Sequence, residues 1–431
     1  MLNNPFATRY TDPELDKIWS KETWAGHIID LWYAELKKLL PASNFIYDPF
    51  TIEQVLTRAN ILEQETHHEL VSLLKAYSEH LTKPAQRLIH LGMTSSDCQD
   101  HADLLMIKAS LQVILVQLSG LISSLANKTF EYAGTPILGR THLQPAEPTT
   151  MGLRLAVPLE QLLSTLDQIQ NMIESFPSKG IRGAVGTMAN TLLSESKLHT
   201  KNVDMSHNLM VSGQTYPRQI DLRTGMLLSD IACTLHKLSF DMRIMATEPY
   251  VIRNSDGVGS SAMPGKINPQ NWEKVTGLSR LMPDIFSGLW HMAASSMLER
   301  TLDDSSSRRV LLPQMFYVIS ECLRTSTKEI DRFAIDVEAA KNHVWDNWKA
   351  WIPSRLLAYE QCRPGIFNRM ELHRNFARDL AEINTMEDFL LGWDYTVEDE
   401  FLFLQAAESL AKTVVSVANY VLKDLDKEGD M

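Results

Sequence analysis

The sequence contains four long runs in which apolar residues recur at alternating steps of three and four. The runs extend from Leu104 to Leu125, from Leu159 to Phe176, from Leu228 to Met245 and from Leu312 to Phe333. This spacing places one apolar stripe on each helix, which suits nearly parallel packing in a bundle. Patterns typical of strands are scarce. The sequence therefore predicts an all-α fold built around long helices.

The apolar stripes fit two arrangements, a core within one chain and a bundle shared between subunits. Periodicity does not separate them, because both arrangements bury the same helix face. A chain of 431 residues can bury a large core, and a shift from short mixed helices to long striped ones predicts three helical domains. We expect an N-terminal domain over 1–93, a central long-helix bundle over 94–338 and a C-terminal domain over 339–431.

Charge and composition exclude several classes of protein. The formal net charge of -12 disfavours a general binder of nucleic acid or membrane surfaces, whose footprint is a basic patch. The first residues show no basic region followed by an apolar run, so we expect no secretory signal there. The most apolar stretch, Leu104 to Ala126, is interrupted by Lys108 and Gln112. We expect that stretch to be too polar to span a membrane, and the protein to be cytoplasmic. Its cysteines lack metal-ligand spacing and are expected to be reduced, buried thiols: Cys98, Cys233, Cys322 and Cys362.

Three Gly- and Pro-rich connections separate the long runs, over residues 134–148, 176–190 and 246–268. The third is long enough to be a binding loop or a lid. It ends in Asn268-Pro269, which predicts a helix with Asn as N-cap and Pro as its first residue. Residues 257–262 formally match the dinucleotide fingerprint GxGxxA, but no strand is predicted before them, so this interpretation is rejected.

The same loop carries the string GSSAMPGKINP at residues 259–269. It resembles the signature GSSxMPxKxNP of the fumarase/aspartase superfamily, and every fixed position of that pattern is present. Two further blocks resemble that superfamily and follow in the expected order. They are HLGMTSSD at residues 90–97 and GRTHLQPA at residues 139–146.

Other blocks narrow the resemblance to adenylosuccinate lyases within that superfamily. These blocks are RYT at 9–11, THHEL at 66–70, SGQTY at 212–216 and ERTLDDSSSRR at 299–309. Two positions depart from the pattern. Glu69 stands where the family usually has Asp, and Gly265 matches the fumarase version of the loop. These departures leave open a shifted substrate preference.

The resemblance implies that the chain eliminates fumarate from a succinylated purine nucleotide. A proton leaves the carbon beside a carboxylate while the C–N bond to the purine breaks. In this scheme Ser260 is the base, His142 protonates the departing nitrogen, and Lys266 stabilises charge that develops on the succinyl carboxylate. The implied catalytic residues are Ser260, His142, Lys266, Glu273 as the partner of the histidine, and His68 as a second histidine.

The resemblance also implies a set of substrate-binding residues rich in hydroxyls and guanidiniums, which suit phosphate and carboxylate oxygens. This set is Arg9, Tyr10, Glu69, Thr94, Ser95, Thr141, Gln214, Asn268, Arg300, Ser305 and Arg309. Arg308, by contrast, is expected on a solvated or salt-bridged surface. No His/Glu spacing indicates a metal site, and the scheme requires neither a metal nor another cofactor.

Two alternatives remain open. A sister lyase, such as an argininosuccinate lyase or a fumarase, would act on a substrate without phosphate, although Arg9-Tyr10 and the Arg300 to Arg309 block suit a phosphate. A catalytically silent structural relative would have lost the serine, histidine or lysine, all of which are present. The resemblance further implies a homotetramer whose active sites combine blocks from different subunits. It does not separate adenylosuccinate from the succinyl-carboxamide ribotide of purine synthesis as the preferred substrate.

Overall fold

The computed structural model describes residues 5–41, 44–198, 209–253, 263, 265–361, 369–391 and 400–429. The chain divides into two compact units, each made of three segments. Unit 1 comprises Met1–Gln117, Thr165–Cys233 and Gly277–Cys322, and unit 2 comprises Leu118–Ser164, Thr234–Thr276 and Leu323–Met431. The three-domain division expected from the sequence stays a prediction.

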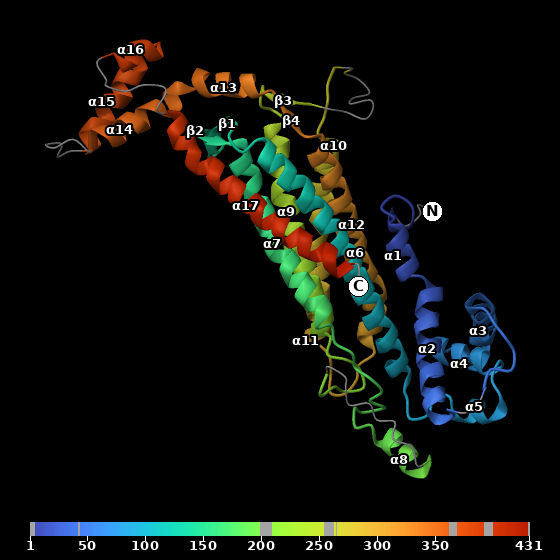
Figure 1. Ribbon diagram of the computed structural model, residues 1–431. Coiled ribbons are helices and arrows are strands. Elements are labelled where there is room, and N and C mark those ends of the chain that lie inside the picture. The colour runs from blue at the N-terminus through green and yellow to red at the C-terminus, as the bar shows by residue number, and fades with distance from the viewer. Residues whose placement is uncertain are drawn as a thin grey trace. The chain divides into compact units, whose positions relative to one another are not determined.

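The four apolar runs lie on long helices, as predicted. They fall on α6 (Ser95–Glu131), α7 (Met151–Glu174), α9 (Gln219–Met245) and α12 (Asp303–Arg332), except that Phe176 and Phe333 lie just beyond the ends of α7 and α12. Within each unit, segments of these helices lie side by side (Figure 1). Their stripes are buried: Ile107, Leu162, Leu235 and Phe316 are each 0% exposed. The all-α prediction is confirmed.

The other described helices complete the two units (Figure 1). They are α1 (Pro13–Ile18), α2 (Lys21–Leu39), α3 (Ile52–Thr66), α4 (Glu69–Ser78), α5 (Lys83–Leu88), α8 (Ala189–Leu198), α10 (Gln270–Ser279), α11 (Leu281–Ala294), α13 (Val337–Asp346), α14 (Ile352–Gln361), α15 (Arg369–Glu382), α16 (Met386–Leu390) and α17 (Glu400–Gly429), with 3-10 turns η1 (Pro5–Ala7) and η2 (Trp348–Ala350). Helix α10 begins one residue after the start predicted at Asn268-Pro269.

Side-chain caps begin the first helices of unit 1. Asp12 accepts hydrogen bonds from the first amides of α1, and Ser20 accepts one from the amide of Thr23 in α2. These caps satisfy amides that have no partner inside the helix. Below them, the core of this region contains Trp32 stacked on Tyr77, with ring centroids 6.0 Å apart. The start of α2 is thus held in a defined position.

Unit 2 contains a hairpin where the sequence predicted only a loop. Strands β1 (Pro136–Thr141) and β2 (Gln144–Thr150) pair antiparallel, with Pro136 opposite Thr150 and Arg140 opposite Pro145. Pro145 and Pro148 on β2 obscured the strand, since proline lacks an amide donor. A two-stranded ribbon tolerates proline because each strand has one free edge. A second pair joins β3 (Val251–Ile252) to β4 (Ala334–Ile335).

By length and composition, α6 qualifies as a helix that could cross a membrane. The expectation that this stretch is too polar to span a membrane is therefore wrong by that criterion. Leu111, Ile114, Leu118 and Leu121 on this helix are nevertheless 0% exposed inside the protein. Such burial is the pattern of a core helix, which passes the same test.

The cysteines confirm the sequence prediction only in part. Cys98, Cys233 and Cys322 are free thiols, and Cys98 and Cys322 are buried. Cys233 is exposed, so the expectation that it is buried was wrong. Its position on α9 faces away from the apolar stripe of that helix. Cys362 lies outside the described residues.

Candidate functional site

Unit 1 contains a cavity of about 990 Å³ on which eight of the predicted site residues converge. They come from the loop before α4, the start of α6, the segment before α9 and the start of α12. They are His68, Glu69, Thr94, Ser95, Gln214, Arg300, Ser305 and Arg309. The stretch of sequence from the first of these residues, His68, to the last, Arg309, is more than 200 residues long, and the fold brings them together around one space.

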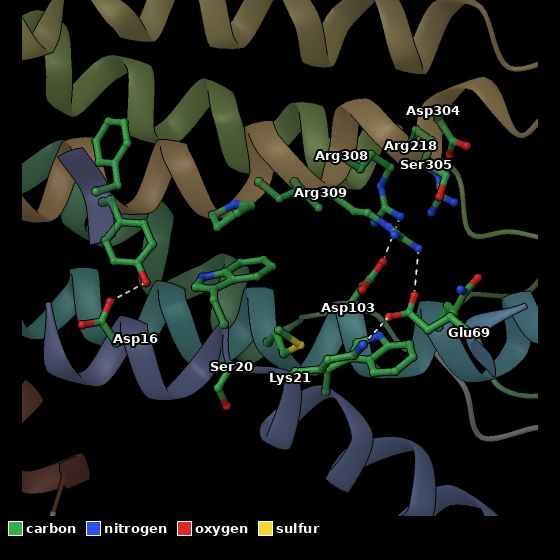
Figure 2. A pocket seen from close by; sticks show the side chains of 18 of the residues that line it. Asp16, Ser20, Lys21, Glu69, Asp103, Arg218, Asp304, Ser305, Arg308 and Arg309 are labelled. Atoms are coloured by element: carbon green, nitrogen blue, oxygen red, sulfur yellow. Dashed lines mark hydrogen bonds and ion pairs between the residues drawn. The ribbon is translucent and has the colours of Figure 1, made fainter. Parts of the chain in front are cut away.

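A second cavity of about 440 Å³ shares six lining residues with the first (Figure 2). The shared residues are Lys21, Glu69, Gln99, Arg300, Ser305 and Arg309. Beyond these shared residues, the smaller cavity is lined by aromatic side chains, including Trp19, Trp24 and Tyr317. The two spaces together offer guanidiniums at their junction and apolar rings beyond it.

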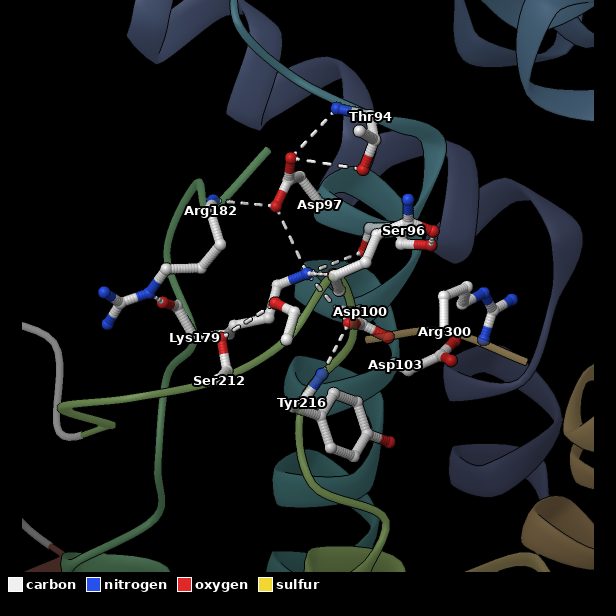
Figure 3. A network of polar contacts seen from close by, with 12 residues as sticks. Thr94, Ser96, Asp97, Asp100, Asp103, Lys179, Arg182, Ser212, Tyr216 and Arg300 are labelled. Carbon is white, nitrogen blue, oxygen red and sulfur yellow. Dashed lines mark hydrogen bonds and ion pairs between the residues drawn. The ribbon is translucent and has the colours of Figure 1, made fainter. Parts of the chain in front are cut away.

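Asp97 shapes the turn that presents Thr94 and Ser95 at the start of α6 (Figure 3). One oxygen of Asp97 accepts from the Thr94 amide at 2.9 Å and from the Thr94 hydroxyl at 3.3 Å. The carboxylate also accepts from the backbone amides of Arg182 and Gly183, at 2.9 and 3.1 Å. Asp97 therefore ties the turn to the loop at residues 176–190.

Lys179 is a fully buried cation next to that turn. Its ammonium lies 3.2 Å from Asp97 and 2.9 Å from Asp100 (Figure 3). It also donates to the backbone carbonyl of Gln214 at 2.7 Å and to that of Ser96 at 3.2 Å. The Ser96 hydroxyl in turn donates to the Gln214 side chain at 3.2 Å. Lys179 thereby fixes Gln214, a predicted substrate-binding residue, against the start of α6.

Arg218 extends this network toward α12. Its guanidinium lies 3.1 Å from Asp100 and 2.7 Å from Asp304, and Asp304 also accepts from Arg300 at 3.1 Å. Burial alone raises the pKa of Asp100, but the charges of Lys179 and Arg218 outweigh it and hold that pKa below its usual range. Asp100 therefore stays ionised, and Arg300 is held by a carboxylate that is itself anchored.

Arg308 is buried, so the expected surface position was wrong, whereas the salt-bridged alternative agrees with its contacts. Its guanidinium contacts Asp103 and Asp221, each at 2.8 Å, and it donates to the Tyr216 hydroxyl. Burial raises the pKa of Asp103, and the neighbouring Arg308 opposes that rise only in part. A buried guanidinium needs such carboxylates. Arg308 thus supports α12 next to the exposed Arg309.

The residues at the cavity junction are less buried. Arg309 lies 2.9 Å from the Glu69 carboxylate, which also lies 3.3 Å from the Lys21 ammonium (Figure 2). His68 is exposed and caps α4 through its ring nitrogen, which accepts from the Val71 amide at 3.4 Å. These side chains are accessible to a ligand.

Thr141 and His142 lie in unit 2, at the exposed turn of the β1–β2 hairpin, where His142 has a φ of 52°. The hairpin is anchored by Arg140, which donates to both carboxylate oxygens of the buried Glu248 at 2.5 and 3.1 Å. Arg140 also donates to the Leu143 carbonyl at 3.3 Å. The turn that carries the imidazole is thereby fixed from within unit 2.

Unit 2 also contains Lys266, Asn268 and Glu273. Lys266 is exposed, Asn268 is partly buried, and Glu273 lies in the first turn of α10 as predicted. The ion pair that the structure shows for Glu273 is with Arg243, at 4.0 Å, and not with His142. Ser260 lies outside the described residues.

Arg9 and Tyr10 follow η1 in unit 1. Arg9 is exposed, and the Tyr10 ring lies 6.0 Å from that of Phe6, which lines the smaller cavity. Neither Arg9 nor Tyr10 lines either of the two cavities themselves. They lie beside the cavity-lining segment.

Sequence reasoning missed the residues that hold the site together. Asp97, Asp100 and Asp103 recur every three positions in an otherwise apolar helix, which is a detectable signal of a charged face. Their partners Lys179 and Arg218 come from loops and offer no comparable pattern. Pairing across such distances becomes visible only in the fold.

Comparisons with known proteins show the family to which the chain belongs. A family model described as lyase matches residues 42–282. The adenylosuccinate lyase of Schistosoma mansoni is 30% identical over 372 residues, covering 82% of this chain and 76% of that protein. That of Saccharomyces cerevisiae is 31% identical, covering 74% and 71%, and that of Pyrococcus abyssi is 28% identical, covering 100% of both.

Solved structures share the fold. A 3-carboxy-cis,cis-muconate lactonizing enzyme from Pseudomonas putida matches with a TM-score of 0.77 at 20% identity, covering 97% of this chain and 99% of that one. A fumarate lyase from a Mesorhizobium species also matches with a TM-score of 0.77, at 17% identity, covering 96% and 99%. At these identities the similarity shows the fold alone.

Proposed function

Because the chain belongs to the adenylosuccinate lyases of the fumarase/aspartase superfamily, we propose that its cavity in unit 1 binds adenylosuccinate for cleavage to AMP and fumarate. The chain is a carbon–nitrogen lyase. The second expected substrate is the succinyl-carboxamide ribotide of purine synthesis, which would give fumarate and the aminoimidazole carboxamide ribotide.

One observation carries the assignment to this cavity: seven residues expected to bind substrate and the expected catalytic residue His68 line the same space. Its volume of about 990 Å³ lies at the upper end of small-molecule sites. Arg300 and Arg309 offer planar donors for phosphate oxygens, and Thr94 and Ser95 offer hydroxyls for the succinyl carboxylates. Lys179 holds Gln214 through its backbone carbonyl, and the Gln214 side chain can form a hydrogen bond with the purine base of the substrate.

The residues of unit 2 supply the chemistry in this proposal. Ser260 takes the proton from the carbon beside the carboxylate, and the electron pair left behind forms the double bond of fumarate. Lys266 stabilises the negative charge on the carboxylate during this step. The C–N bond breaks, and His142 delivers a proton to the departing nitrogen. Glu273 supports that imidazole when subunits assemble.

The assembly proposed is a homotetramer in which unit 1 of one chain and unit 2 of others complete each site. This arrangement accounts for exposed apolar side chains on the long helices. Val116 on α6 is 72% exposed, and Met226 on α9 is 53% exposed. The proposed setting is purine biosynthesis in the cytoplasm.

The test is to incubate the purified protein separately with adenylosuccinate, argininosuccinate and malate, and to detect the products by chromatography. We expect fumarate and AMP from adenylosuccinate. Turnover of argininosuccinate or malate without turnover of adenylosuccinate would identify a sister lyase. No turnover of any of the three would identify a silent structural relative.

A further inference from the structure

Lys21, Glu69 and Arg309 form a charged cluster where the two cavities of unit 1 meet. The Glu69 carboxylate lies between two cations, with one oxygen 3.3 Å from the Lys21 ammonium and the other 2.9 Å from the Arg309 guanidinium. Figure 2 shows Arg309 reaching this carboxylate from α12 and Lys21 reaching it from the opposite side. Lys21 was not among the residues that the sequence predicted for the site.

The cluster contains more positive than negative charge. Arg308 contacts two carboxylates, and Arg300 and Arg218 are paired with Asp304 and Asp100, whereas Lys21 and Arg309 share the one charge of Glu69. An excess cation at a cavity junction attracts an anion, even in a chain with a net charge of -12.

Helix stability does not explain Lys21. It is the first residue of α2, and a cation at a helix N-terminus is opposed by the helix dipole. Residues that break a local rule in this way often serve a site. The Lys21 side chain is 46% exposed and reaches toward the cavity junction rather than into the core.

The proposed function already has Arg309 binding the phosphate of the substrate. Resting on that function, we propose that Lys21 is a further ligand of this phosphate and that Glu69 is the internal counter-ion that the phosphate replaces. A phosphate has nearly two negative charges and three acceptor oxygens, so it can contact both cations at once. The Arg309 guanidinium suits two of these oxygens, and the Lys21 ammonium acts as a point charge.

The identity of residue 69 fits this exchange. Glutamate is one methylene longer than the aspartate that the resemblance leads one to expect there. From its position as the first residue of α4, this longer side chain spans the space between Lys21 and Arg309. Glu69 thereby keeps the two cations paired and oriented when no substrate is bound.

Binding of inorganic phosphate, measured by titration calorimetry, tests the role of Lys21. We expect Lys21→Met to weaken phosphate binding about 5- to 20-fold, since it removes one charge-assisted contact at a partly exposed position. Lys37→Met is the matched control, because Lys37 is an exposed lysine on the same helix outside both cavities. Lys21→Arg should retain binding.

Phosphate affinity equal to wild type in Lys21→Met would overturn the proposal. So would a loss of succinate binding with unchanged phosphate binding, because the ligand would then be a carboxylate. In turnover assays we expect Lys21→Met to raise KM for adenylosuccinate while kcat stays near wild type. A wild-type protein that binds phosphate but does not turn over adenylosuccinate would refute the proposed function. The phosphate-binding role of Lys21 would still be supported in that case.

Glu69→Gln tests the exchange itself. Without a carboxylate to displace, this variant should bind inorganic phosphate more tightly than wild type, by about 3- to 10-fold. Weaker phosphate binding in Glu69→Gln would mean that Glu69 helps to hold the ligand, and the counter-ion role would be wrong. The sign of the change therefore decides between the two roles.

Discussion

A lysine in a protein interior is costly unless its charge is matched, and Lys179 meets that condition with two carboxylates. Its ammonium contacts Asp97 and Asp100, and it also donates to two backbone carbonyls that border the larger cavity. Removing one partner from such a network leaves the others as uncompensated buried charges. The side chain therefore contributes to stability and to the position of Gln214.

Lys179→Met is expected to lower the free energy of unfolding by about 3–5 kcal/mol, because Asp97 and Asp100 lose their shared cation. Urea unfolding followed by circular dichroism measures this change. Lys128→Met is the control, since Lys128 makes a more exposed pair with Glu131 at 2.9 Å. A loss no larger than that of the control would show that the buried pairs contribute little.

A second residue links stability to pH. The Trp32 indole donates to Nδ1 of His90 at 3.1 Å, which requires this nitrogen to be unprotonated. Burial lowers the pKa of His90, and the nearby Asp97 opposes this only in part. The folded protein therefore favours neutral His90, whereas the unfolded chain protonates near the usual value of about 6.5. The stabilisation that neutral His90 contributes is therefore present above the unfolded-state pKa of about 6.5, and it is lost as the pH falls below that pKa.

Thermal unfolding between about pH 7.5 and about pH 5.5, which spans the ordinary histidine pKa of about 6.5, checks this linkage. We expect the melting temperature of wild type to fall with pH, and His90→Gln to show a smaller fall. His373→Gln, at an exposed histidine on α15, should behave as wild type. If His90→Gln keeps the full wild-type dependence on pH, another group causes it.

At the scale of elements, the long helices were predictable and the hairpin was not. The three-four spacing in α6, α7, α9 and α12 is repeated over many turns, so the signal accumulates along each helix. The hairpin is short and contains prolines, and its pairing depends on a partner strand and on the Arg140–Glu248 contact. Long-range contacts of this kind leave no periodic pattern.

The hairpin gives a prediction at Gly139, where β1 and β2 approach closely. A Cβ at this position would lie 2.3 Å from the Glu147 backbone oxygen. Gly139→Ala should therefore distort the hairpin that carries His142, and lower kcat for adenylosuccinate about 10- to 100-fold. Gly120→Ala is the control: it lies within α6 with open space around it, so it should preserve kcat and slightly raise the melting temperature.

Steady-state kinetics and melting curves on both variants separate the two effects. A distorted hairpin lowers kcat while the helical core keeps the chain folded, whereas general destabilisation would lower the melting temperature strongly as well. Wild-type kcat in Gly139→Ala would show that the close approach of β1 and β2 does not position His142.

At the scale of the whole molecule, most of the predicted site residues fall into two sets. His68, Glu69, Thr94, Ser95, Gln214, Arg300, Ser305 and Arg309 line a cavity of unit 1, and His142, Lys266, Asn268 and Glu273 belong to unit 2. The sequence motifs predicted the members of both sets. They could not predict the distances within each set, because those depend on Lys179, Arg218 and other loop residues that the motifs omit.

Two inactive variants test whether sites are shared between chains. Ser260→Ala and His142→Ala should each lose nearly all activity alone, since each removes a proposed proton-transfer group. When the two are denatured together in equal amounts and refolded, random tetramers should recover about one quarter of wild-type activity. That fraction follows because a site is intact only when its serine comes from a His142→Ala chain and its histidine from a Ser260→Ala chain.

The controls make this result specific to sharing. Each variant refolded alone should remain inactive, and mass spectrometry should confirm that mixed tetramers have formed. If verified hybrids stay inactive, each site draws both residues from one chain, and the proposed division of the serine and the histidine between different chains is wrong. Recovery near one quarter requires the serine and the histidine of one site to come from different chains, because neither variant alone contains both.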